Sequence, residues 1–164
     1  MAYYDASSIV DGSGNLNVST LIDQLDSKLA IRRGNAKTDH IGSPDSTSSS
    51  SAVNLDTYSI SDVEPDDLIT VLSFMWCSCG TANEAISATT VNVTPGAGSD
   101  NAAPQITSPY ADTGGERDLH ISTAEFTGFT GTLSLAFQWR RSSGSGTIYS
   151  AKRYHQWTIQ KRRS

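Results

Sequence analysis

The chain of 164 residues contains only two cysteines, Cys77 and Cys79, separated by one serine. Two cysteines at this spacing give no disulfide framework. They could supply half of a zinc site, but the sequence has neither a second Cys pair nor a closely spaced His pair for the other half. We therefore expect two buried, unreactive thiols that pack as small hydrophobic groups, and no metal or cofactor.

Long apolar runs are also missing. No stretch reaches the roughly 18 apolar residues of a membrane-spanning helix. Residues 1–15, MAYYDASSIVDGSGN, have neither the basic nor the apolar region of a secretory signal. The sequence predicts a protein that is made in the cytoplasm and has no membrane partner.

Recognisable catalytic patterns are absent too. There is no Gly-x-Ser-x-Gly elbow, and the three histidines, His40, His120 and His155, are isolated in the sequence. We expect His120 to point outward and His155 to point inward, both without a catalytic role. The acidic residues of the segment 62–67 are expected to cap and solubilise a turn, not to form the paired carboxylates of a glycosidase. The sequence therefore predicts a protein that is not an enzyme.

Basic residues are unevenly distributed. The formal net charge is -5, yet the segment from residue 140 onward has seven basic residues and no acidic one. They cluster at expected strand ends and turns, so we expect contact with an acidic protein surface, such as the 62–67 turn of a neighbouring copy, and no nucleic-acid partner. The seven are Arg140, Arg141, Lys152, Arg153, Lys161, Arg162 and Arg163.

The longest apolar stretch is LITVLSFMWCSC, residues 68–79. Its β-branched and aromatic content favours a strand over a core helix. Because apolar residues occupy both parities, we expect a central strand that is covered on both faces.

Residues 55–164 as a whole show short apolar segments with strand periodicity, separated by turn signals. The alternation is clearest at 132–141, which places Leu133, Leu135, Phe137 and Trp139 on one face. We expect Trp76, Trp139 and Trp157 to point inward. This pattern predicts a mainly β domain, an antiparallel β-sandwich of jelly-roll or immunoglobulin-like type.

Residues 1–33 are expected to form a polar arm, 1–16, and one amphipathic helix, 17–32. The helix carries an apolar stripe that needs a partner, because an isolated helix of this length is marginal in water. Either the protein's own β domain or another subunit could cover the stripe. We predict that it is an oligomer or scaffold contact and that the chain self-associates, as a trimer rather than a dimer. The stripe consists of Val18, Leu21, Ile22, Leu25 and Leu29.

Residues 34–54, GNAKTDHIGSPDSTSSSSAVN, are rich in serine and have no apolar periodicity. This composition predicts a linker that runs over a surface.

The segment YSISDVEPDDLITVLSFMW, residues 58–76, resembles the β-sandwiches of tailed-bacteriophage virions, in which a polar turn precedes a long apolar strand. The turn lacks the glycine that is often found there. The last strand, YHQWTIQKR at 154–162, and the order of arm, helix, linker and sandwich resemble capsid decoration or cement proteins and head or tail fibres.

The resemblance implies a non-enzymatic structural protein of the virion that binds the shell through its N-terminal region. Its partners would be the major capsid protein or another virion protein. The alternative is a receptor- or carbohydrate-binding module of a phage tail or head fibre, with Trp76, Trp139 and Trp157 as candidate platform residues. No residue's role is carried over from the family.

Overall fold

The computed structural model describes residues 31–39, 44–81, 84–95, 99–102, 105–107 and 117–161. These parts of the chain form ten β-strands and no helix. The strands are β1 (Ile31–Asp39), β2 (Asp45–Thr47), β3 (Val53–Val63), β4 (Asp67–Cys79), β5 (Ala85–Asn92), β6 (Ser99–Ala102), β7 (Gln105–Thr107), β8 (Arg117–Thr127), β9 (Gly131–Ser143) and β10 (Ile148–Lys161).

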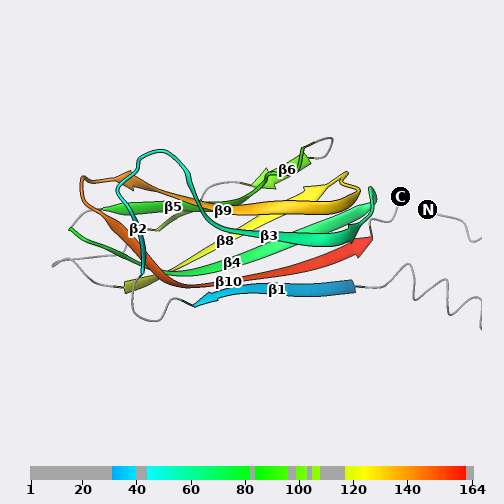
Figure 1. Cartoon of the computed structure of the whole chain (residues 1–164), viewed down its shortest axis with the longest axis horizontal. Coiled ribbons are helices and arrows are strands. Elements are labelled where there is room, and N and C mark those ends of the chain that lie inside the picture. Colours follow the sequence, from blue (N-terminus) through cyan, green and yellow to red (C-terminus); the bar gives the residue numbers. More distant parts are fainter. Residues whose placement is uncertain are drawn as a thin grey trace, which may run out of the picture.

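The strands make two sheets that pack face to face (Figure 1). The six-stranded sheet has the order β1-β10-β4-β8-β6, and β2 also pairs with β10. The four-stranded sheet has the order β3-β9-β5-β7. Every pairing is antiparallel. The predicted mainly β fold, an antiparallel sandwich, is confirmed.

The apolar stretch 68–79 forms most of β4, which lies between β10 and β8 in the larger sheet. Its odd-numbered residues are buried against the smaller sheet, among them Ile69, Val71 and Met75. Its even-numbered residues lie on the outer face, where Phe74 is half-buried and Trp76 is 48% exposed. The central position was predicted correctly, but the prediction that both faces are covered was wrong, and so was the inward orientation predicted for Trp76.

The interior contains two apolar clusters. One surrounds Ile69, Phe126 and Leu133. The other surrounds Met75 and Phe137 and includes Trp139, which is buried as predicted. Burial of aliphatic and aromatic side chains at about 1.5–3 kcal/mol each is the main term that holds the two sheets together.

The segment 34–54 is not an unstructured linker. It contains most of β1, all of β2 and the first residues of β3, and Ile31 and Arg32 belong to β1, not to a helix. β1 pairs with β10 from Ile31 to Asp39 through backbone hydrogen bonds, which polar residues can make as well as apolar ones. Gly34 lies against the Trp157 ring, and a Cβ there would come within 2.5 Å of ring carbons. The arm and the stripe Val18–Leu29 lie outside the described residues.

Candidate functional site

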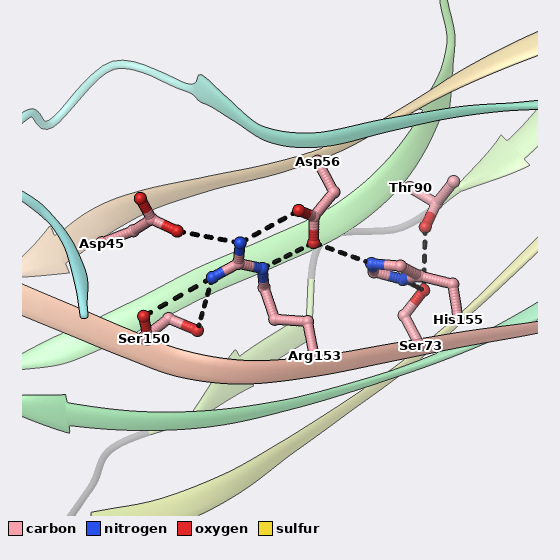
Figure 2. Close-up of polar contacts among 7 residues, drawn as sticks. All are labelled: Asp45, Asp56, Ser73, Thr90, Ser150, Arg153 and His155. Carbon is pink, nitrogen blue, oxygen red and sulfur yellow. Dashed lines mark hydrogen bonds and ion pairs between the residues drawn. The ribbon is translucent and has the colours of Figure 1, made fainter. Parts of the chain in front are cut away.

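A cluster of polar side chains lies between the two sheets (Figure 2). β3 and β5 of the smaller sheet each contribute one residue, β4 and β10 of the larger sheet contribute four, and β2 contributes one. We call this set the inter-sheet cluster. It consists of Asp45, Asp56, Ser73, Thr90, Ser150, Arg153 and His155.

Strand periodicity and one bulge direct these side chains inward. Ser73 lies between Val71 and Met75 on the buried parity of β4, so it separates the two apolar clusters. In β10 the register against β4 shifts between Ser150 and Lys152. A bulge of this kind changes the parity, which lets Ser150 and Arg153 both be buried although they are three residues apart.

Arg153 is the charged centre of the cluster and is only 2% exposed. Its guanidinium donates to both carboxylate oxygens of Asp56, from Nε to Oδ2 at 2.5 Å and from Nη2 to Oδ1 at 3.0 Å. Nη2 also lies 2.8 Å from Oδ2 of Asp45, and Nη1 lies 3.4 Å from the Ser150 hydroxyl. The bidentate contact supplies the acceptors that a buried arginine requires.

His155 continues the network on the other side of Asp56. Its Nε2 lies 3.0 Å from Asp56 Oδ2, and its Nδ1 lies 2.9 Å from Ser73 Oγ. Ser73 Oγ in turn lies 3.0 Å from Thr90 Oγ1. The imidazole stacks on the Tyr58 ring, with centroids 5.0 Å apart, so it is held by packing as well as by hydrogen bonds.

Asp56, His155 and Ser73 therefore have the connectivity of a Ser-His-Asp nucleophilic triad. The sequence did not reveal it, because His155 is 99 positions from Asp56 and 82 positions from Ser73. Only the inward orientation of His155 was predicted correctly. However, Ser73 is 1% exposed, and its oxygen is engaged by both His155 and Thr90. A surface depression on the outer face of the smaller sheet is lined by Ser87, Thr89 and other residues, and no member of the inter-sheet cluster lines it.

A nucleophile must approach its substrate to near van der Waals contact, and Ser73 is closed off by the two packed sheets. The hydrogen bonds of the inter-sheet cluster instead satisfy buried polar groups. They thereby fix the position of β3 and β5 in one sheet relative to β4 and β10 in the other.

His120 was predicted to point outward, and the structure shows that it is fully buried. The apolar character of Leu119 and Ile121 predicts that they point inward from β8, but both lie on the outer face. His120 Nε2 lies 3.3 Å from the Ala88 carbonyl, and burial lowers the pKa of the imidazole below its ordinary value of 6.5.

The lowered pKa of His120 predicts a loss of stability in acid. Below about pH 6.5 the unfolded chain takes up a proton at this residue that the folded chain resists, so stability falls as the pH drops toward the folded pKa, by up to about 1.4 kcal/mol per pH unit. Urea unfolding between about pH 7.5 and 5 should show a smaller decrease for His120→Gln, which can still donate to the Ala88 carbonyl, than for wild type. Equal slopes in the two proteins would contradict this assignment.

Cys77 and Cys79 are free and buried, as predicted. Burial raises the pKa of the Cys77 thiol to about 12 and that of Cys79 to about 11, so neither is a thiolate near neutral pH. Each lies near a backbone carbonyl oxygen, Cys77 near that of Asp118 and Cys79 near that of Glu84. Both are packing residues.

The acidic turn and the basic C-terminal strand contact each other within one chain, whereas we expected this contact between copies. The Asp67 carboxylate accepts from the Glu64 amide and from Arg32, both at 2.9 Å, and Lys161 pairs with Glu64. Of the basic residues expected at strand ends and turns, Arg153 is inside the sandwich.

The outer face of the larger sheet is the second candidate site. Phe74 of β4 lies opposite Tyr154 on one side and Ile121 on the other, and Trp76 lies opposite Leu119. Trp76 and Ile121 are each 48% exposed, and Tyr154 is 37% exposed. We call Phe74, Trp76, Leu119, Ile121 and Tyr154 the outer apolar patch. Trp157, by contrast, is half-buried and stacks on Tyr58.

No known protein family has a model that matches this chain, and no curated protein is detectably similar to it in sequence. Within the described residues, no three His, Cys, Asp or Glu side chains come together in a way that could hold a metal ion. In the same residues, no helix is long and apolar enough to cross a membrane.

Proposed function

We propose that the chain is a non-enzymatic structural protein of a virus particle, a capsid decoration or cement protein. It would attach to the shell through its N-terminal region, and the sandwich would be the body that faces outward. Its partners are other copies of itself and the major capsid protein or another virion protein.

The outer apolar patch carries this proposal. Adjoining exposed apolar side chains on one face are typical of a contact with another molecule. The chain thus offers a surface suited to assembly, whereas the Ser73–His155–Asp56 network is closed to substrate. The resemblance of residues 58–76 to phage virion sandwiches gives the kind of assembly.

Negative-stain imaging of purified protein mixed with shells that lack it tests the proposal. We expect added density at regular positions on the shell. Shells that remain bare at protein concentrations well above those of the shell sites would contradict it.

One observation favours a second function, a carbohydrate-binding module of a fibre. Trp76 and Tyr154 are exposed on one face, and sugar rings stack on such aromatic side chains. Trp139 is buried and cannot contribute. A glycan array with the full chain distinguishes the two functions: hits that disappear in Trp76→Ala would favour the glycan-binding module, and an array without hits would favour the structural protein.

A further inference from the structure

We infer that a depression on the outer face of the smaller sheet binds one acidic sugar unit, a monosaccharide that bears a carboxylate. The depression lies over β5 and β9 and has a volume of about 230 Å³. We call it the β5–β9 depression. It is on the opposite side of the sandwich from the outer apolar patch (Figure 1). The inference therefore goes beyond the proposed structural function, because it assigns a ligand to a different face.

Strand alternation places polar side chains along the β5–β9 depression. Trp139 of β9 is buried in the interior, so its two neighbours, Gln138 and Arg140, point to the outer face. In the register of the two strands, Ser87 lies opposite Arg140 and Thr89 lies opposite Gln138. Two hydroxyls, one amide and one guanidinium therefore line the depression together.

Arg140 supplies a positive charge that the fold does not use. Its side chain is exposed, and no carboxylate among the described residues forms an ion pair with it. None of the residues that line the β5–β9 depression is acidic. A planar guanidinium matches a carboxylate through two parallel hydrogen bonds, which a lysine does not offer. The charge at this face therefore favours a ligand with a carboxylate.

The hydroxyl of Thr89 is a second polar group without a partner. Thr89 is 7% exposed, and its Oγ1 is buried without a hydrogen bond to any described residue. Buried polar atoms are nearly always paired, so an unpaired one beside a depression points to a ligand that supplies the partner. Rotation about χ1 moves a threonine hydroxyl between staggered positions. Such a rotation brings Thr89 Oγ1 toward a ligand oxygen, next to the hydroxyl of Ser87.

The size and mixed chemistry of the β5–β9 depression favour a sugar ring over a lone anion. Pockets for drug-sized ligands measure about 300–1,000 Å³, and the smaller volume here suits a single ring. Ala52 and Val91 add apolar surface for the C–H groups of that ring. Gln138 donates one N–H to Asn54 and retains a second N–H and its oxygen for ring hydroxyls. An isolated carboxylate would leave these groups unused.

NMR titration of the ¹⁵N-labelled full chain with galacturonic acid tests the inference. Galactose is the matched control, because it has the same ring without the carboxylate, and acetate supplies the carboxylate without the ring. We expect galacturonic acid to cause saturable shifts of the backbone amides of β5 and β9. Galactose and acetate should each bind at least about tenfold more weakly, the effect typical of losing hydrogen bonds to a charged group or the contacts of the ring.

Three variants locate the ligand. Arg140→Gln removes the charge and should lower the affinity for galacturonic acid at least about tenfold. Thr89→Val keeps the side-chain shape and removes the hydroxyl, so it should weaken binding about fivefold without destabilising the fold, because that hydroxyl has no partner in the described structure. Arg33→Gln is the control, since Arg33 is an exposed arginine of β1 in the other sheet, and it should bind like wild type. The amide spectrum of each variant shows whether it is folded.

Four results would overturn the inference. Galacturonic acid that causes no saturable shifts in β5 and β9 would show that the depression is not its site. Galactose that binds as tightly would show that the carboxylate is not recognised. Acetate that binds as tightly would show a site for a lone carboxylate, such as an acidic side chain of a partner protein. Unchanged affinity in folded Arg140→Gln would place the ligand elsewhere.

Trp76→Ala separates this site from a glycan site on the outer apolar patch. We expect it to bind galacturonic acid like wild type, and a loss of binding would place the sugar on the patch and overturn the inference. None of these measurements uses shells, so the proposed function stands or falls separately.

Discussion

Replacing Asp56 by alanine is expected to destabilise the sandwich by about 3–5 kcal/mol, the cost typical of breaking a buried ion pair. The variant leaves the guanidinium of Arg153, which is 2% exposed, without its bidentate acceptor. It also removes the acceptor 3.0 Å from His155 Nε2. Because domains are stable by only about 5–15 kcal/mol, urea unfolding followed by tryptophan fluorescence should show a large shift of the midpoint.

Asp45→Ala is the matched control. Its carboxylate contacts the same guanidinium, but its side chain is 40% exposed, so we expect a loss below about 1 kcal/mol. A second comparison is Asp56→Ala combined with Arg153→Met, which removes the buried charge together with its partner and should recover part of the loss. If Asp56→Ala cost no more than Asp45→Ala, the inter-sheet cluster would not be the structural element that we describe.

Alkaline pH is expected to destabilise the fold through three buried groups. Burial raises the pKa of Tyr58 to about 12, that of Cys77 to about 12 and that of Cys79 to about 11. The ordinary values are 10.0 for the phenol and 9.0 for the thiols. Between the ordinary and the raised pKa the unfolded chain ionises while the folded chain resists. Stability is therefore complete below about pH 9 and is lost as the pH rises toward 12.

Each group adds up to about 1.4 kcal/mol per pH unit within its window. Cys77→Ala/Cys79→Ala should flatten the decrease that begins near pH 9, and Tyr58→Phe should flatten the decrease that begins near pH 10 while it keeps the ring that stacks on His155. The free energy of unfolding, measured by urea titration from about pH 8 to 11, provides the check. A wild-type curve that is level over this range would refute the assignment.

The part of the fold that was predictable from sequence is the part with a strong apolar pattern. β4 and β9 were recognised from β-branched and aromatic residues at strand spacing. β1 was missed because it is a polar strand at the sheet edge, whose pairing with β10 depends on backbone groups common to all residues. An apolar pattern along a strand indicates that its side chains are buried. An edge strand can form with few buried side chains, so it need not show this pattern.

The orientation of β8 was predicted wrongly for a related reason. Leu119 and Ile121 were assigned inward because they are apolar, which placed His120 outside. When the outer face of a sheet is also apolar, hydrophobicity cannot distinguish the inward-facing from the outward-facing residues of a strand. The same ambiguity affected Trp76. These errors therefore identify the outer apolar patch, the surface to which we attribute contact with another molecule.

The inter-sheet cluster was beyond sequence reasoning for a different reason. His155 is 99 positions from Asp56 and 82 positions from Ser73 in the sequence. None of the three belongs to a short motif. Only the parity of His155 in β10 pointed to the interior. Such clusters depend on how two sheets are superposed, which the pattern along each strand does not encode.

The central claim is that the chain acts through its outer surface and that its buried triad-like network is structural. The most direct measurement uses shells prepared without this protein, to which the purified protein is added. The amount that co-sediments with the shells is compared among wild type, Ser73→Ala and Trp76→Asp/Ile121→Asp. We predict wild-type binding for Ser73→Ala and strongly reduced binding for the patch variant, because the outer apolar patch is the surface on which the proposed assembly function rests. Lost binding in folded Ser73→Ala, together with unchanged binding of the patch variant, would contradict the account.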